Sequence, residues 1–349
     1  MNLLFLSGDI SRSGGTERMT AWLANSLCKA HSVTIASLSG SGRSFFELSP
    51  EVKLVNLKAK HPRLAIRKLM KSENIDIAIN VDTGMAIFGI PAAVGLKTKV
   101  ITWEHSNFCN NWNSKWFRYI RRFAAQHSDA MVVLTERDKE NYEKNIRNCR
   151  PVTVIHNPVE KRAVDYSDES KIILSAGHLA PVKRFGLIPE IGRIIFERFP
   201  NWQWKICGEG DERGMIKEKI KKYGLEKNII LAGRTENMDA EYESAAIFAL
   251  TSEMEGLPMV LLEAKAHGLP IVSFDIMTGP AEIIDDGMNG FLVGSGDVRA
   301  MAERLMELMG DDELRRGFSR NSAVGLEKFD EMGVIEGWGR VLAKVTRRL

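Results

Sequence analysis

The sequence is poor in cysteine and in motifs that bind metal. Its 349 residues include four cysteines, Cys28, Cys109, Cys149 and Cys207, and no CxxC pair, which argues against a disulfide framework or a zinc knuckle. No Asp-x-Asp occurs, and no His, Cys and Asp cluster has the spacing of a metal site. We therefore expect no bound metal, no cofactor, and a reducing, cytoplasmic compartment.

Long apolar runs are also missing. The longest, Met85–Leu96, is interrupted by Gly89, Pro91 and Gly95 and falls short of the roughly 20 residues that a membrane span needs. At the N-terminus no basic leader precedes the apolar residues 3–6, so we expect a first core strand there and no signal peptide. A soluble or membrane-peripheral protein is expected.

Charge is balanced overall but not along the chain. Lys and Arg number 48 against 45 Asp and Glu, and the chain is 44% hydrophobic and 27% charged, proportions that exclude a disordered or low-complexity protein. Residues 1–160 hold 22 basic and 14 acidic side chains, whereas the remainder holds 26 and 31. The basic half indicates either an anionic partner or charge that is simply dispersed in solvent.

Short apolar runs alternate with amphipathic stretches along the whole chain, and this alternation predicts parallel sheets covered by helices. The pattern runs to about residue 155 and begins again near Lys171, with a polar linker at 157–170 between. We predict two Rossmann-like doubly wound domains, 1–160 and 161–330. The strands are expected at 3–6, 33–38, 52–57, 75–79, 99–103, 130–134, 152–155, 172–177, 202–207, 228–231, 247–250, 271–274 and 291–293.

Ligands of doubly wound sheets bind beyond the carboxyl ends of the strands, so the loops there are the candidate sites. After the strand ending at Leu250 the chain reads SEMEGLPMVLLEA, in which Glu255 and Glu263 are eight residues apart. Pro258 suits the first turn of a helix and Gly268 its end. The free N–H groups at the start of such a helix can hold a phosphate.

The stretch EGLPMVLLEA, followed by GLPIVSFDIMTGPAEII at 268–284, resembles the retaining GT-B glycosyltransferases of family GT4. The resemblance implies a GT-B fold, with two Rossmann-like domains facing each other across a cleft. It also implies that Glu255 lies near the donor sugar and that Glu263 binds the ribose hydroxyls of a nucleotide. The residues around the helix start that would contact the donor are Gly256, Leu257, Met259 and Val260.

A second loop, SAGHLAPVKR at 175–184, follows the first strand of the back domain. A cation there can neutralise a leaving diphosphate, which gains charge as the glycosidic bond breaks. By the resemblance this cation is Lys183. Members of the family usually have Arg where this chain has His178, so either Arg184 compensates or His178 is protonated beside the phosphates.

In the front domain, the loop GDISRSGGTER joins the first strand to the first helix. Its Gly14 and Gly15 permit close backbone approach, and Thr16 can cap the helix. The resemblance places this loop against the donor phosphates and the acceptor. It also implies that His105, in the WEHSNF segment after another strand, contacts the donor sugar, although a lone histidine is often only structural.

Two further positions are candidates for contact with the nucleotide. Gly208 lies in the strand-to-helix turn CGEGD, where glycines serve turn geometry and can also approach a sugar nucleotide. Arg234 follows the strand near Leu231, where members of the family wrap the base with backbone groups.

Two basic stretches rich in large apolar residues, 61–71 and 112–123, suit the surface of an anionic membrane. Alternatively, their aromatic side chains face the core and their Arg side chains face water. No nucleic-acid-binding motif occurs, so we expect no nucleic acid partner. The helix near 331–349, which contains Trp338, resembles the terminal segment that crosses back to the first domain in GT-B enzymes.

The sequence therefore predicts a retaining, metal-independent hexosyltransferase that uses a UDP-sugar, of galactose or GalNAc type. The acceptor would be a hydroxyl of a lipid-linked glycan in surface polysaccharide or oligosaccharide assembly. A GDP-mannose-dependent mannosyltransferase and a non-catalytic sugar-nucleotide-binding protein remain alternatives. A dehydrogenase is disfavoured because no GxGxxG follows a strand with an acidic residue about 20 positions on.

Overall fold

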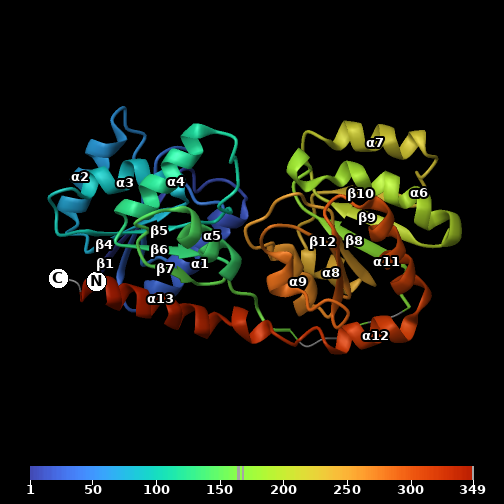
Figure 1. Cartoon of the computed structure of the whole chain (residues 1–349). Coiled ribbons are helices and arrows are strands. Elements are labelled where there is room, and N and C mark those ends of the chain that lie inside the picture. The colour runs from blue at the N-terminus through green and yellow to red at the C-terminus, as the bar shows by residue number, and fades with distance from the viewer. Residues whose placement is uncertain (163–165, 167–168, 348–349) are drawn as a thin grey trace. The chain divides into compact units, whose positions relative to one another are not determined.

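The chain folds into two compact units. The computed structural model describes residues 1–162, 166 and 169–347 (Figure 1). One unit, here called unit 1, consists of Met1–Asn157 and Glu331–Leu349, and the other, unit 2, consists of Pro158–Asp330. Of the segment 157–170 that we predict to be a linker, residues 163–165 and 167–168 lie outside the described residues.

In unit 1 the described strands form one parallel sheet of seven, in the order β3-β2-β1-β4-β5-β6-β7. The central strands are continuous apolar runs because helices bury them on both faces. The predicted strands are confirmed, with β4 beginning two residues later than expected. The bounds are β1 (Asn2–Ser7), β2 (Ser32–Ser37), β3 (Val52–Asn56), β4 (Ile77–Val81), β5 (Lys99–Trp103), β6 (Ala130–Val133) and β7 (Val152–Val154).

The helices of unit 1 cover both faces of this sheet. Figure 1 shows α2, α3 and α4 on one face, where α3 contacts each of the other two, while α1 contacts α13. The bounds are α1 (Gly15–Leu27), α2 (Pro62–Ser72), η1 (Thr83–Met85), α3 (Ala86–Ala93), α4 (Lys115–His127), α5 (Glu136–Asn145) and α13 (Glu331–Thr346). The last helix is anchored by Trp338, which is fully buried and lies 5.1 Å from Trp103 between ring centroids.

In unit 2 the described strands form a parallel sheet of six, in the order β10-β9-β8-β11-β12-β13. The strands are β8 (Ile172–Ala176), β9 (Gln203–Cys207), β10 (Ile229–Gly233), β11 (Ile247–Leu250), β12 (Ile271–Asp275) and β13 (Gly290–Gly294). The helices are η2 (Pro181–Lys183), η3 (Phe185–Leu187), α6 (Ile188–Arg198), α7 (Arg213–Lys222), α8 (Met238–Glu243), α9 (Met259–Ala266), α10 (Pro280–Ile283), α11 (Val298–Gly310), α12 (Asp312–Arg320) and η4 (Leu326–Phe329). The six strands of unit 2 confirm the second predicted set of strands.

Each sheet reverses its strand order beside its first strand, between β1 and β4 in unit 1 and between β8 and β11 in unit 2. Such a switch point is where the loops on either side diverge and leave room for a ligand. The loops that follow β1 and β4, and those that follow β8 and β11, are therefore where a ligand is expected to bind.

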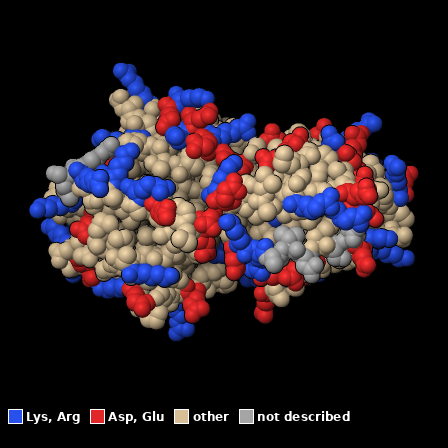
Figure 2. Space-filling model, turned by 90° about the horizontal axis from the view of Figure 1, so that it is seen from below, with Lys and Arg blue, Asp and Glu red and all other residues tan. Residues whose placement is uncertain are grey.

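Surface charge is mixed on the face shown in Figure 2, where Lys and Arg are interspersed with Asp and Glu on each unit. That face agrees with dispersed, solvated charge and shows no patch of a single sign. In the described part of the chain, no helix is both long and apolar enough to span a membrane.

Candidate functional site

The two loops at the switch point of unit 2 are joined by an ion pair between two predicted site residues. Lys183 follows β8 and Glu255 follows β11, and Lys183 Nζ lies 2.5 Å from Glu255 Oε1. Thr251 Oγ1 donates a hydrogen bond to the Lys183 carbonyl oxygen at 2.9 Å. The N–H of Glu253 donates to the Val182 carbonyl oxygen at 2.8 Å. The structure thus brings together residues 72 positions apart in the sequence.

A second ion pair links the same two loops. Arg184 Nη2 lies 2.7 Å from one carboxylate oxygen of Glu253, and Arg184 Nε donates to the other at 3.1 Å. The Arg184 guanidinium thus binds both carboxylate oxygens of Glu253, a residue of the same unit. The backbone of Arg184 has φ 49° and ψ 32°, a left-handed conformation that is uncommon for a residue with a side chain. His178, by contrast, is exposed in the loop after β8.

The helix that follows Glu255 begins one residue later than its sequence suggests. Pro258 is at the N-cap position and α9 starts at Met259, so Pro258 precedes the first turn. The N–H groups of Leu261 and Leu262 bond back to the Pro258 carbonyl oxygen, and those of Met259 and Val260 precede them at the helix start. Gly268, with φ 77°, follows the end of the helix as predicted.

The TGPAEII segment supports the Glu255 loop from the other side. Thr278 Oγ1 donates a hydrogen bond to the Glu255 carbonyl oxygen at 2.6 Å. Gly279 has φ 102°, and a Cβ there would lie 2.4 Å from Pro258 Cδ. This close approach between the two segments requires a glycine, which explains the Gly in the motif. Gly256 and Leu257 lie between these two anchor points, and Leu257 is buried.

Glu263 on α9 is held by a tyrosine that the sequence did not single out. The hydroxyl of Tyr242, on α8, donates to Glu263 Oε2 at 2.7 Å. The Tyr242 ring is buried and stacks on the His267 ring, with 4.9 Å between centroids. Only the fold brings α8 beside α9, so no spacing in the sequence indicates this contact.

Lys265 on α9 is a second residue that the sequence analysis missed. Its side chain is buried, and its Nζ donates a hydrogen bond to the Ile283 carbonyl oxygen at 2.5 Å. Burial lowers the pKa of this lysine to about 8. Lys265 therefore ties the end of α10 to the helix that contains Glu263.

The glycine turns of unit 2 have a packing role. Gly208 has φ 147°, and a Cβ there would lie 1.9 Å from the Gly177 carbonyl oxygen. The N–H of Gly208 donates to the Gly233 carbonyl oxygen at 2.7 Å, so the loops after β8, β9 and β10 pack closely. Arg234, at the end of β10, is exposed.

The first loop of unit 1 places both predicted glycines at the start of α1. Gly14 is the N-cap and Gly15 the first helical residue, so Thr16 lies inside the helix and does not cap it, contrary to our expectation. A Cβ at Gly15 would meet no atom within 4 Å. Gly15 thus offers backbone that a ligand could approach at the switch point beside β1, whereas the Glu17 carboxylate lies against Gly14.

His105 follows β5, and its ring packs against Trp103 with 4.0 Å between centroids and a tilt of 51° between the ring planes. Burial lowers its pKa to about 3, so the imidazole is neutral at physiological pH. Its Nε2 is buried and has no hydrogen-bond partner among the described residues. A neutral imidazole offers one donor and one acceptor and no charge.

Beside His105 lies a buried polar cluster that the sequence analysis missed, here called the Glu104 cluster: Asp82, Thr83, Glu104, Ser106, Arg121, Asp138 and Tyr142. Glu104 is 0% exposed, at the carboxyl end of β5. Asp82, with φ 73°, occupies the adjacent end of β4, where its N–H donates to the Trp103 carbonyl oxygen at 2.8 Å. Apolar runs between amphipathic stretches predict the sheet, but only the parallel register places these strand ends together.

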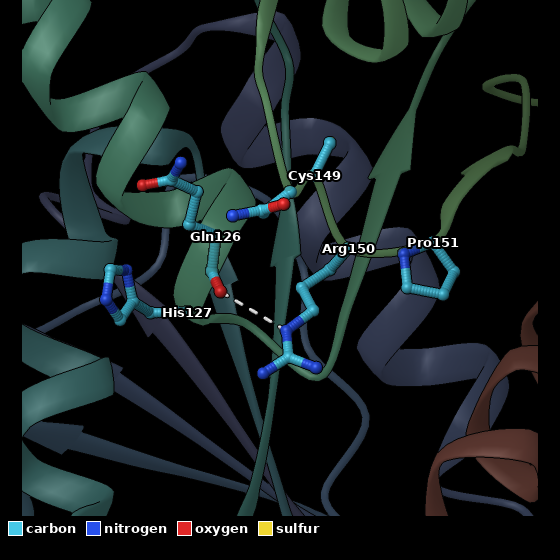
Figure 3. Close-up of a pocket in the computed structure, with 6 residues that line it drawn as sticks. Gln126, His127, Cys149, Arg150 and Pro151 are labelled. Carbon is cyan, nitrogen blue, oxygen red and sulfur yellow. Dashed lines mark hydrogen bonds between the residues drawn. The ribbon is translucent and has the colours of Figure 1, made fainter.

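A surface pocket elsewhere in unit 1 includes none of the predicted residues. As Figure 3 shows, it lies where α4 ends and β7 begins, and Arg150 Nε donates to the Gln126 carbonyl oxygen at 3.2 Å. This is the amino-terminal edge of β6 and β7, opposite the edge that holds His105. Its lining residues are Gln126, His127, Asn148, Cys149, Arg150 and Pro151. Within the described residues, no three His, Cys, Asp or Glu side chains are grouped so that they could hold a metal ion.

Comparison with known families gives two matches that together span most of the chain. Residues 157–324 match the family model described as Glycosyl transferases group 1, and residues 13–162 match Glycosyltransferase Family 4. The first match contains Lys183, Glu255 and Glu263, and the second contains His105.

The relatives that are similar over nearly the full length include two glycosyltransferases of known organisms. An uncharacterized glycosyltransferase of Haemophilus influenzae is 30% identical over 97% of this chain and 99% of its own. The Campylobacter jejuni GalNAc-alpha-(1->4)-GalNAc-alpha-(1->3)-diNAcBac-PP-undecaprenol alpha-1,4-N-acetyl-D-galactosaminyltransferase is 31% identical over 99% of both chains.

A solved structure, that of Anabaena HepE in complex with UDP, has a similar fold. It superimposes with a TM-score of 0.82 and 16% identity, covering 99% of this chain and 100% of its own. At this identity the likeness concerns the fold alone, and it confirms the predicted GT-B class.

Proposed function

Because the chain belongs to the group 1 glycosyltransferases of family 4, a family of retaining hexosyltransferases, we propose that it uses a UDP-sugar as donor. The transferred group is a hexosyl or N-acetylhexosaminyl residue, and the acceptor is a hydroxyl of a glycan in surface polysaccharide or oligosaccharide assembly. The observation that supports this most is the contact between Lys183 and Glu255 at the switch point of unit 2.

The pair suits a site at which a diphosphate leaves. An ammonium group has three N–H donors, so Lys183 can bond to Glu255 and still offer donors to phosphate oxygens. Negative charge grows on those oxygens as the glycosidic bond breaks, and a fixed cation stabilises that change. Since the pair is only partly exposed, with 23% and 12% of the side chains accessible, solvent screens it less than a surface pair.

The roles of the two glutamates differ. Glu255 positions the donor sugar and stabilises charge that develops on it, without forming a covalent bond. Glu263, fixed by Tyr242, accepts hydrogen bonds from the ribose hydroxyls. The N–H groups of Met259 and Val260 at the start of α9 bind phosphate oxygens, which helix N-termini favour. His105 donates a hydrogen bond to the sugar without bringing charge to it.

The proposed nucleotide and sugar of the donor follow from the names of the relatives. The Campylobacter jejuni relative is named as an N-acetylgalactosaminyltransferase, and HepE was solved with UDP. The first name supports a GalNAc or galactose-type sugar, and the second supports a uridine nucleotide. GDP-mannose is the nearest alternative, and a preference for GDP over UDP in binding would favour it.

The acceptor is proposed to be lipid-linked and the protein to bind peripherally to an anionic membrane. The name of the Campylobacter jejuni relative includes an undecaprenol-linked glycan. In unit 1, α2 and α4 flank α3, and both present apolar side chains to solvent, among them Leu64 at 66% and Trp116 at 56% exposed. Basic side chains accompany them on both helices, a combination that suits anionic headgroups.

Turnover of the donor tests the proposed function without knowledge of the acceptor. Purified protein is incubated with UDP-GalNAc, UDP-galactose, UDP-glucose or GDP-mannose. Release of the free nucleotide is measured with and without an extract of lipid-linked glycans. We expect UDP release that rises when the correct acceptor is present. Tight UDP binding with no turnover of any donor would favour the non-catalytic alternative.

A further inference from the structure

His105 lies in a short segment, 104–108, whose two ends are fixed by buried carboxylates. At one end Glu104 accepts hydrogen bonds at Oε1 from the N–H of Ser106 at 3.0 Å and from its hydroxyl at 2.7 Å. At the other end the N–H of Phe108 donates to Asp138 Oδ1 at 2.7 Å. The histidine is therefore held between two anchored residues.

Glu104 is in turn oriented by groups from three elements. Its Oε2 accepts a hydrogen bond from the Tyr142 hydroxyl at 2.7 Å and from Thr83 Oγ1 at 3.2 Å. Arg121 Nε, from α4, lies 3.7 Å from the same oxygen. The carboxylate thus links the ends of β4 and β5 with α4 and α5, and its rotamer cannot change without breaking several of these contacts.

We propose that Glu104 is a positioning residue of the transfer reaction, which together with Asp138 holds the segment 104–108 and hence the imidazole of His105. The inference rests on the role proposed above for His105. It goes further because it assigns the geometry of that histidine to buried groups that do not themselves touch the donor.

The composition of the Glu104 cluster favours positioning over stability. Burying ions is costly, and a buried pair contributes little unless every donor is satisfied. Here three buried or half-buried carboxyl groups, Asp82, Glu104 and Asp138, surround one guanidinium. Arg121 Nε and Nη1 have no hydrogen-bond partner among the described residues. An apolar core would serve stability better, so the polar groups are expected to serve the site.

The cluster also contains carboxyl groups that titrate near neutral pH and that help to hold the segment containing His105. Burial and the charge of Glu104 raise the pKa of Asp138 to about 7 and that of Asp82 to about 6, against the opposing charge of Arg121. The other titratable groups nearby are Tyr142 and Cys109, whose pKa values burial raises further from neutrality. Because His105 has a pKa of about 3, its own titration is not expected to shape activity between pH 6 and 8.

The first test replaces Glu104 by Gln. Glu104→Gln removes the charge and two of the acceptor sites while Asp82 and Asp138 still face Arg121. We expect kcat for donor turnover to fall about 10- to 100-fold, because a small displacement of a contacting group costs this much. UDP affinity, measured by calorimetry, is expected to stay within about twofold.

The matched control is Glu140→Gln on α5, where the same substitution removes only an exposed ion pair with Lys144. It should leave kcat unchanged. Tyr142→Phe, which deletes one hydrogen bond to Glu104 and keeps its charge, should cause a smaller loss than Glu104→Gln. Full activity in Glu104→Gln would overturn the proposal.

Two readouts separate positioning from a merely structural role. Ionisation of Asp138 makes its hydrogen bond to Phe108 charge-assisted and stronger, so kcat should rise with pH through about 7. Asp138→Asn should abolish this rise of kcat with pH. Glu104→Gln should shift the rise to lower pH, because it removes the negative charge that raises the pKa of Asp138. An unaltered pH profile in both variants would contradict the proposal.

The second readout does not require turnover. In protein labelled at histidine, the ring signals of His105, assigned with a His105→Gln variant, should shift in Glu104→Gln and not in Glu140→Gln. If the wild type uses no sugar nucleotide, the proposed function fails while the ring shift still decides whether Glu104 positions His105. If the wild type is active and the ring signals do not move, this inference fails alone.

Discussion

The two units hold their candidate site residues by different means. In unit 2, Lys183 and Arg184 pair with Glu255 and Glu253 across two loops, and all four side chains are partly exposed. In unit 1, Glu104 and its neighbours are withdrawn from solvent, and the predicted site residue His105 is neutral. Under the roles proposed here, the charges that would meet a ligand are accessible and paired, whereas the charges that would orient another residue are buried.

Because of this difference, mutations in the two units are expected to alter different properties of the protein. Changes in unit 2 should act on binding of the nucleotide and on the charge of the leaving group. Changes in unit 1 should act on geometry and on the pH dependence, because Asp82 and Asp138 have pKa values of about 6 and 7.

The largest effect is expected for Glu255→Gln. The variant keeps the shape of the side chain and a weaker hydrogen bond to Lys183, but it lacks the negative charge beside the donor sugar. Donor turnover should fall on the order of 100- to 1,000-fold, with UDP affinity nearly intact. Glu190→Gln, which affects an ion pair with Lys219 in the same unit, is the control. Equal loss of binding and turnover in Glu255→Gln would refute the assigned role.

Lys183→Met should lower turnover about 100-fold and also weaken UDP binding, because it removes a cation from the diphosphate. It also removes the ammonium group that lies against the Glu255 carboxylate, so that this negative charge is no longer offset by Lys183 where phosphates would bind. The control is Lys139→Met on α5, which removes an exposed pair with Glu136. Retention of full UDP affinity in Lys183→Met would show that the diphosphate is bound by other groups.

In unit 1, Asp138→Asn should flatten the dependence of stability on pH. The folded protein binds the Asp138 proton up to about pH 7, whereas an unfolded chain releases it near the ordinary value of 3.8. The wild type therefore loses stability as the pH rises between these values, by about 1 to 4 kcal/mol. Thermal unfolding at pH 5 and pH 8 measures the difference, which should shrink in the variant. An unchanged difference would mean that Asp138 titrates normally.

The smallest effect is expected for Tyr242→Phe. The ring and its stacking on His267 remain, but the hydrogen bond to Glu263 is lost, which costs about 1 kcal/mol, or roughly fivefold, in UDP affinity. Calorimetric titration checks this. If the affinity is unaffected, the Tyr242 hydroxyl does not orient Glu263 for nucleotide binding.

The sequence predicts most of the fold because both sheets consist of short apolar runs between amphipathic helices. The motif EGLPMVLLEA likewise places Glu255 and Glu263 at a helix start, and α9 begins there. The features that the sequence does not predict are contacts between segments far apart in the chain. Tyr242 reaches Glu263 from another helix. Thr16 shows the limit of local rules, since Gly14 caps α1 without any side chain.

The central claim, a UDP-sugar site in unit 2 built on Lys183 and Glu263, is tested most directly by calorimetric titration of the purified protein with UDP, GDP and NAD, without metal and then with Mg²⁺. We predict micromolar binding of UDP that Mg²⁺ does not alter. Preference for GDP would redirect the donor to mannose, and binding of NAD alone would contradict the account.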